Sequence, residues 1–228
     1  MTSIVVTVDL RPLFGPIRNQ GPRPTCLAFA ASDAHAALRD GWIALSCEYA
    51  FYHAQRRAQR TSSQGALLSS MLEVLRHDGQ PTECGWPYLP STPTDAASWR
   101  PPAEVGPLFG CAGETSNASV DRIVAALDQG RPVIVLMALS RAFFSPSTQA
   151  AVEPAIGEVP EPERRHAVIA VGHGTVDGKR AILVRNSWGA RWGDGGYAWL
   201  TADFLGPRMF RVVTLMETFD VSGHRATA

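Results

Sequence analysis

The spacing of apolar residues in this 228-residue chain changes from a helical to a strand-like pattern at about residue 130. Four earlier segments favour helices by this spacing: residues 26–39, 46–60, 67–77 and 119–129. Five later apolar runs, separated by glycine-rich turns, favour strands: residues 133–139, 167–171, 181–185, 196–201 and 211–216. Helices followed by strands predict an α+β fold with two lobes, because each group must bury its own apolar face.

Local signals mark where some of these elements begin and turn. Ser46 can cap the helix that starts beside it, and Glu48 lies near the N-terminal dipole of that helix. Asp177-Gly178 fits a two-residue hairpin turn between two strands. Residues 80–115 hold seven prolines and predict an extended loop, and the Pro-, Ser- and Glu-rich residues 145–163 predict a mobile loop.

Composition excludes several classes of protein. Hydrophobic residues make up 45% of the chain and charged residues 18%, which is typical of a globular protein and too apolar for a disordered one. Lys plus Arg and Asp plus Glu number 21 each, so no net charge favours nucleic acid or an anionic membrane. No apolar stretch approaches the ~18 residues of a membrane span. We therefore expect neither nucleic acid nor a membrane as a partner.

Cys26 stands at the start of the first expected helix. Backbone N–H groups at a helix N-terminus favour negative charge, which lowers the pKa of a cysteine there and favours the nucleophilic thiolate. Gln20 lies earlier in a Gly- and Pro-rich loop, and its side-chain amide can donate to a developing oxyanion. Because an isolated cysteine is commonly a small buried residue, Cys26 is a candidate nucleophile only together with partners farther along the chain.

Two later residues can supply these partners. His166 begins an expected apolar strand, and the small side chain of Ala167 leaves room for a general base beside a cleft. The side-chain oxygen of Asn186 can accept a hydrogen bond from the imidazole and fix its tautomer, with Trp188 shielding that bond from water. His173 is the only rival base among the six histidines, and we expect it to lie beyond its strand end.

The order of these pieces resembles that of the papain-like cysteine peptidases. Their pattern of Gln-Gly-x-x-x-x-Cys-x-Ala-Phe, then His before small and β-branched residues, then Asn-Ser-Trp-Gly matches residues 20–29, 166–168 and 186–189. His166 follows Cys26 by 140 residues (166 − 26), within the roughly 130–150 typical of papain-like enzymes. Asn186 follows by 160 (186 − 26), and a hairpin insertion would explain the excess. Other segments that resemble the family are residues 9–11, 45–48, 64–66, 86–88 and 192–197.

The resemblance implies a papain-like fold of two lobes with the active-site cleft between them. It implies a single catalytic domain over residues 1–228, with a helical lobe at about residues 15–115. The other lobe, an antiparallel β-sheet or barrel, would span about residues 116–220 plus the N-terminal segment. Catalytic roles fall to Cys26, His166, Asn186 and Gln20, and substrate binding falls to Gly65 and Trp188. Gly65 would offer an extended backbone edge to a substrate peptide.

The implied activity is that of a cysteine endopeptidase, which hydrolyses peptide bonds through a Cys-His-Asn site and a thioester acyl-enzyme. The expected partner is a peptide or protein substrate. No metal or organic cofactor is required, and the chain has no CxxC pair of the kind that binds structural zinc. Two alternatives stay open: the same site can pass the acyl group to an amine, as in a transpeptidase, or the domain can be an inactive peptide-binding module.

The chain has four cysteines: Cys26, Cys47, Cys84 and Cys111. Resembling enzymes of secretory compartments carry a cysteine three residues before the nucleophile, bridged to another near the glycine-rich segment, whereas this chain has Arg23 there. Cys26 follows Met1 by only 25 residues (26 − 1), so we expect a bacterial-type form without an inhibitory pro-segment. These features favour a reducing, cytoplasmic location, with a single Cys84–Cys111 bridge as the alternative.

Two features depart from the family pattern. Arg165 precedes His166, where many relatives carry Asp or Asn. A guanidinium close to the imidazolium would oppose a Cys26–His166 ion pair unless Arg165 points into solvent. Residues 22–25 read Pro-Arg-Pro-Thr, which is stiffer than the usual Gly/Ser/Cys segment and would change the shape of the loop before the nucleophile.

Overall fold

The computed structural model describes residues 2–95, 97–148 and 150–221. The chain divides into two compact units, each made of two separate stretches of sequence. We call them the β-rich unit, which comprises Met1–Asn19 and Thr115–Thr214, and the helical unit, which comprises Gln20–Glu114 and Leu215–Ala228. The chain therefore crosses from one unit to the other after Asn19, after Glu114 and after Thr214.

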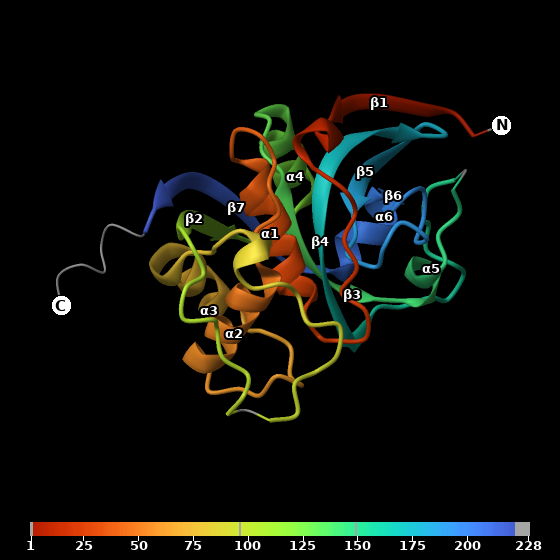
Figure 1. The fold of residues 1–228 in the computed structure, drawn as a ribbon. Helices are drawn as coiled ribbons and strands as arrows, with labels where there is room; N and C mark the ends of the chain where they lie inside the picture. The colour runs from red at the N-terminus through yellow and green to blue at the C-terminus, as the bar shows by residue number, and fades with distance from the viewer. Residues whose placement is uncertain (1, 96, 149, 222–228) are drawn as a thin grey trace. The chain divides into compact units, whose positions relative to one another are not determined.

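The β-rich unit is built on an antiparallel sheet with the strand order β7-β3-β4-β5-β6 (Figure 1). Its strands are β1 (Ile4–Asp9), β3 (Val133–Leu139), β4 (Glu161–Val176), β5 (Lys179–Arg185), β6 (Tyr197–Thr201) and the first part of β7 (Met209–Asp220). One edge of β4 pairs with β5, and the other edge pairs first with β3 and then with β1. Among the described residues the sheet is open, so the expected sheet or barrel is a sheet.

Apolar side chains of this sheet and of α4 (Val120–Asp128) form the core of the β-rich unit. Every residue of β3 is buried, which is why that segment reads as a continuous apolar run in the sequence. Ile123 and Leu127 are the buried residues of α4, which contacts β3 and β4. Short helical turns complete the unit: η1 (Arg11–Leu13), α5 (Arg141–Phe144), α6 (Ala202–Leu205) and η4 (Gly206–Arg208).

The strand predictions were confirmed where the signal is local. The strand at residues 133–139 is β3, and Asp177-Gly178 forms the β4–β5 turn with φ angles of 49° and 76°, as a type I′ turn requires. The prediction for residues 167–171 was wrong in extent, because β4 begins at Glu161, inside the expected mobile loop, and ends at Val176. No strand was predicted for β1, which gains its hydrogen bonds from β4.

The helical unit is built on α1 (Cys26–Ala37), α2 (Cys47–Arg57) and α3 (Leu68–Glu73), and α3 continues as the π-helical segment η2 (Val74–Asp78). Helix α1 contacts both α2 and α3, and all its residues after Cys26 are buried. The predicted cap is confirmed, because the Ser46 hydroxyl accepts a hydrogen bond from the backbone N–H of Tyr49 at 3.1 Å. Small side chains suit α1 to this burial, since alanine loses little conformational entropy in a helix.

The expected long loop at residues 80–115 is only partly a loop. It contains η3 (Glu83–Gly85) and most of β2 (Phe109–Ser116), and β2 pairs with β7. This pairing joins segments that are far apart in sequence, so no local sequence pattern predicts it. The longest helix described is α1 with 12 residues, and within the described ranges no helix is long and apolar enough to cross a membrane.

Candidate active site

Cys26 is the first residue of α1, and its side chain is half-buried. The helical hydrogen-bond ladder begins one residue earlier, where the carbonyl oxygen of Thr25 accepts from the backbone N–H of Phe29 at 3.0 Å. The first N–H groups of a helix lie outside this ladder and create a positive potential at its N-terminus. Cys26 therefore lies where the helix dipole favours a negative charge.

Gln20 opens the loop that leads to Cys26 in the same unit. Its side-chain Nε2 donates to the backbone carbonyl oxygen of Arg23 at 2.8 Å. The backbone carbonyl oxygen of Gln20 accepts from the Tyr88 hydroxyl at 2.6 Å. The same hydroxyl lies 2.9 Å from Oγ1 of Thr25. Tyr88 thus binds both ends of the loop, which is fixed by hydrogen bonds as well as by its two prolines.

Gly65 lies beside this loop and is exposed. A Cβ atom built on Gly65 would lie 3.9 Å from the carbonyl oxygen of Pro24, so the glycine backbone approaches the segment just before Cys26. Gln55 anchors the preceding residues 61–64, because its Nε2 donates to two of their carbonyl oxygens at 2.5 and 2.6 Å. The helical unit therefore holds the expected nucleophile, oxyanion donor and substrate-binding glycine around one loop.

His166 in β4 and Asn186 directly after β5 form a hydrogen bond in the β-rich unit, with 2.7 Å between Nε2 and Oδ1. Oδ1 also accepts from the backbone N–H of Ser187 at 2.8 Å. Because a backbone N–H can only donate, this contact identifies the atom facing His166 as the oxygen of the amide. Nε2 must then carry the imidazole proton. The lone pair of the neutral ring is on Nδ1, which is the basic atom.

Aromatic rings surround the imidazole of His166. The ring centroids of Trp188 and Phe143 lie 4.7 and 5.8 Å from it, and Trp188 stacks on Phe144 at 5.6 Å. Burial lowers the pKa of His166 to about 4, because the imidazolium loses its hydration, while the hydrogen bond with Asn186 acts in the opposite direction. Without a nearby anion, the imidazole of His166 is therefore neutral near pH 7.

Arg165 faces away from His166. Successive residues of a strand point to opposite faces of the sheet, and the Arg165 guanidinium lies over the ring of Phe210, 5.5 Å from its centroid. Its Nε donates to the carbonyl oxygen of Pro162 at 3.2 Å. The pKa of His166 is shifted by burial and by Asn186 alone, so the unfavourable cation considered from the sequence is not beside the imidazole.

His173, the rival base, was predicted beyond its strand end, and that prediction was wrong. It lies inside β4, where Nε2 is 2.8 Å from Oδ1 of Asp128 at the end of α4. The two histidines therefore have different partners, an aspartate for His173 and an amide for His166. Only the amide partner leaves the imidazole without an adjacent anion.

All four cysteines are within the described residues, and each carries a thiol that is not part of a disulfide. The alternative Cys84–Cys111 bridge is therefore not formed. Cys84 is exposed, whereas burial raises the pKa of the Cys111 thiol to about 12. In the part of the chain that the structure describes, no group of three or more His, Cys, Asp or Glu residues is arranged to hold a metal ion.

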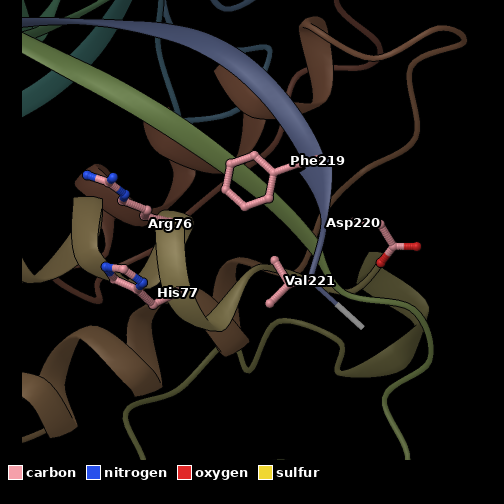
Figure 2. Close-up of a pocket in the computed structure, with 5 residues that line it drawn as sticks. All are labelled: Arg76, His77, Phe219, Asp220 and Val221. Carbon is pink, nitrogen blue, oxygen red and sulfur yellow. The ribbon is translucent and has the colours of Figure 1, made fainter. Parts of the chain in front are cut away.

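A separate hollow lies in the helical unit between η2 and the end of β7 (Figure 2). It is lined by Arg76, His77, Phe219, Asp220 and Val221. Phe219 and Val221 extend toward η2, while Asp220 points to the other side of the strand. None of the candidate catalytic residues lines this hollow.

Sequence reasoning missed Arg23 and Tyr88, which support the loop of residues 20–26. In the sequence, Tyr88 stands out only as part of a segment that resembles the family, and Arg23 only as the residue in place of a family cysteine within the stiff segment 22–25. The residues next to a tyrosine or an arginine do not predict which group its side chain binds, because that group lies far along the chain. Tyr88 bonds to Gln20 across 68 residues of sequence.

The six predicted site residues fall into two groups of three. Gln20, Cys26 and Gly65 belong to the helical unit, and His166, Asn186 and Trp188 belong to the β-rich unit. A hairpin does lie between His166 and Asn186, formed by β4, the turn at Asp177-Gly178 and β5.

Comparison with known proteins gives concordant results. Thiol protease aleurain of Arabidopsis thaliana is 28% identical over 191 residues, which are 81% of this chain and 52% of that protein. Cysteine proteinase 2 of Entamoeba histolytica is 30% identical over 188 residues, which are 80% of this chain and 58% of that protein. The chain thus spans a little more than half the length of these two relatives.

Solved structures show the fold. Xylellain, a cysteine protease from Xylella fastidiosa, superposes with a TM-score of 0.75 at 21% identity, covering 93% of this chain and 86% of that one. The bromelain protease from Ananas comosus superposes with a TM-score of 0.67 at 20% identity, covering 92% and 98%. The fold is therefore papain-like α+β. Residues 5–205 match the model of the papain family of cysteine proteases, and the chain belongs to that family.

Proposed function

We propose that this chain is a cysteine endopeptidase in which Cys26 is the nucleophile, His166 the general base and Asn186 the residue that orients His166. Membership of the papain family supports the reaction class. The observation that carries the assignment of residues is the 2.7 Å hydrogen bond between His166 and Asn186, which leaves the imidazole lone pair on Nδ1. A base needs this lone pair to take the proton of a thiol.

The segment that precedes Gln20 lies beside Trp188 within the β-rich unit. Asn19 pairs with Trp188 in the β-rich unit, and the backbone N–H of Gly189 donates to the carbonyl oxygen of Arg18 at 3.1 Å. Arg18 and Asn19 are therefore bound beside the aromatic neighbour of His166 within the β-rich unit.

The proposed reaction begins when Nδ1 of His166 takes the thiol proton of Cys26. The thiolate attacks the peptide carbonyl carbon, and the resulting oxyanion accepts hydrogen bonds from the Gln20 side-chain amide and the Cys26 backbone N–H. The C–N bond then breaks, and His166 gives its proton to the leaving amine. Water hydrolyses the thioester and restores the thiol. Gly65 and Trp188 are the proposed substrate-binding residues.

The lowered pKa of His166 is compatible with this cycle. A buried imidazole with a pKa of about 4 is a weak base in isolation. The Cys26 thiolate would supply the missing negative charge, and an opposite charge within about 4–6 Å favours the charged form of a titratable group. Formation of the thiolate and of the imidazolium is then one coupled event, in which each ion stabilises the other.

A matched pair of cysteine variants tests the proposal. Cys26→Ser is expected to abolish hydrolysis of a peptide library, because a serine hydroxyl is far less acidic than a thiol, while Cys84→Ser at an exposed site keeps full activity. Cleavage by the Cys26→Ser variant at more than a few per cent of the wild-type rate would remove Cys26 from the mechanism.

The same assay separates the two alternative functions. Added amine nucleophiles would appear in the products of a transpeptidase, and mass spectrometry detects them. An inactive binding module would show no hydrolysis and would not react at Cys26 with a peptidyl epoxide or vinyl sulfone. An endopeptidase yields products with a free carboxylate and is labelled by such a probe at Cys26.

A further inference from the structure

Arg23 lies in the loop between Gln20 and Cys26, and its side chain is fully buried. Its two terminal nitrogens donate to the two carboxylate oxygens of Glu48, NH1 at 2.6 Å and NH2 at 2.9 Å. NH1 also donates to the carbonyl oxygen of Leu89 at 2.6 Å. This is the two-pronged geometry in which guanidinium and carboxylate bind most strongly and with least freedom.

The Glu48 carboxylate is completely buried and fully hydrogen-bonded. Besides the two bonds from Arg23, it accepts from the backbone N–H of Leu89 at 3.1 Å and from Nε1 of Trp99 at 2.7 Å. Glu48 also sits in the first turn of α2, where the helix dipole favours a negative charge. The ion pair therefore joins three separate segments of the helical unit, namely the loop of residues 20–26, the start of α2 and the segment of residues 89–99.

A buried ion pair is an inefficient way to stabilise a fold. Desolvation of the two charges offsets most of their attraction, and replacement by apolar residues is often neutral or stabilising. Such a pair instead favours one defined geometry. If either ion moves, both lose the hydrogen bonds and the electrostatic attraction that offset their desolvation. The position of Arg23, three residues before the proposed nucleophile, indicates which geometry is being fixed.

The backbone of Arg23 connects this ion pair to the site. Its carbonyl oxygen accepts the 2.8 Å hydrogen bond from the Gln20 side chain and also accepts from the backbone N–H of Thr25 at 2.9 Å. The ion pair of its guanidinium thus fixes Arg23, and the backbone carbonyl of Arg23 orients the Gln20 side-chain amide. An oxyanion donor stabilises a transition state only if it is already in place when the charge develops.

We propose that Arg23 and Glu48 are positioning residues for the proposed reaction. Their ion pair anchors the loop of residues 20–26, and the carbonyl of Arg23 holds the Gln20 amide in the orientation that meets the oxyanion. This inference rests on the proposed function, because it assigns the pair a part in the same site. Neither residue touches the substrate, so the pair acts on kcat through Gln20.

A double-mutant cycle tests the link to Gln20. Breaking the pair at one residue leaves a buried, unpaired charge and risks misfolding, so the main variant is the uncharged Arg23→Met/Glu48→Gln. We expect it to lower kcat by about tenfold to 10²-fold, as small displacements of catalytic groups do, with KM nearly unchanged. In a Gln20→Ala background the same two changes should alter kcat by no more than about twofold, since the group they position is gone.

Ser46→Ala is the matched control. Ser46 caps α2 beside Glu48 and donates to the carbonyl oxygen of Trp86 at 2.6 Å, but it has no bond to the loop of residues 20–26 among those described. We expect this variant to lower the unfolding temperature while its effect on kcat is the same with and without Gln20. If Arg23→Met/Glu48→Gln likewise has the same effect in both backgrounds, the pair is only structural and the inference is wrong.

Hydrogen exchange separates a failure of this inference from a failure of the proposed function. The amides of the non-proline residues in the segment 20–26 are expected to exchange faster in Arg23→Met/Glu48→Gln than in the wild type, while those in the middle of α1 keep their rates. Unchanged exchange in the loop would overturn the inference whatever the activity. Wild-type hydrolysis that does not depend on Cys26 would overturn the proposed function, and exchange alone would then decide whether the pair fixes the loop.

Discussion

Asn186 accepts a hydrogen bond from His166 and another from the backbone N–H of Ser187 with the same oxygen atom, at 2.7 and 2.8 Å. The second bond determines the orientation of the amide, and the orientation determines the tautomer of the imidazole. A main-chain contact next to Asn186 thus decides which nitrogen of His166 is basic.

Removal of the Asn186 amide should leave a weaker base in place. In Asn186→Ala the imidazole is no longer held as the Nε2–H tautomer, and the ring can rotate. We expect kcat to fall by about tenfold to 10²-fold, less than the roughly 10² to 10⁴ that a whole general base contributes, while KM stays similar. Steady-state kinetics on a peptide substrate measures both constants. An unchanged kcat would show that Asn186 does not orient the base.

Arg165→Asp should not move the acidic limb of the pH profile of kcat/KM. The Arg165 guanidinium lies over Phe210 and contributes nothing to the pKa shift of His166, so its loss leaves the imidazole as it was. Rates measured from pH 4 to pH 8 for wild type and variant test this. A downward displacement of about one pH unit, worth ~1.4 kcal/mol, would mean that the guanidinium reaches the imidazole in solution.

His35 should make the fold less stable in acid. It is completely buried, with Nδ1 3.0 Å from Oε1 of Gln80, and burial lowers its pKa from 6.5 to about 4. The unfolded chain therefore takes up a proton at His35 near pH 6.5, whereas the folded chain does so only near pH 4. The free energy of unfolding should fall as the pH drops through this window, by about 3 kcal/mol for one such histidine.

Urea denaturation at pH 7 and at pH 4.5 measures this loss. His166 is buried in the same way and adds to it, so the contribution of His35 is obtained from His35→Gln, which has no titrating side chain. The variant should lose less stability than the wild type between the two pH values. Equal losses in both proteins would show that His35 is protonated to the same extent in the folded and unfolded chains.

The thiols of Cys26, Cys84 and Cys111 should differ in their reaction with iodoacetamide at pH 7. Cys26 should be alkylated first, because the helix N-terminus favours its thiolate, and exposed Cys84 should follow more slowly. Cys111 should not react in the native state, because burial raises its pKa to about 12. Peptide mass spectrometry over time gives the order. Alkylation of Cys84 before Cys26 would contradict an activated nucleophile.

Gly65→Val should weaken substrate binding without harming the fold. The site is open enough for a Cβ, which would lie 3.9 Å from the Pro24 carbonyl oxygen, so the valine projects over the edge proposed to pair with the substrate. We expect KM to rise about tenfold, the loss of one or two hydrogen bonds. Gly206→Val, at a glycine with no atom within 4 Å of a built Cβ, is the control that should leave KM unchanged.

The sequence was sufficient wherever a feature depends on neighbours along the chain. The apolar run of β3, the Ser46 cap and the Asp177-Gly178 turn were predicted correctly, because their determinants lie within a few residues of one another. The family followed from the order of short motifs around Cys26, His166 and Asn186. That these three residues act together stays a prediction.

The tertiary structure decided the features that depend on distant partners. Residues 161–166 form part of a strand because β3 offers them hydrogen bonds, and little in their own sequence favours it. Residues 4–8 read Ile-Val-Val-Thr-Val, which favours a strand, but only folding provides β4 as its partner. The sequence could not say whether Arg165 meets the imidazole, since the direction of a side chain depends on the register of its strand. Arg23 is the clearest case. The buried guanidinium has lost its hydration and needs a partner for its charge, and Glu48, 25 residues away, is brought there by folding alone.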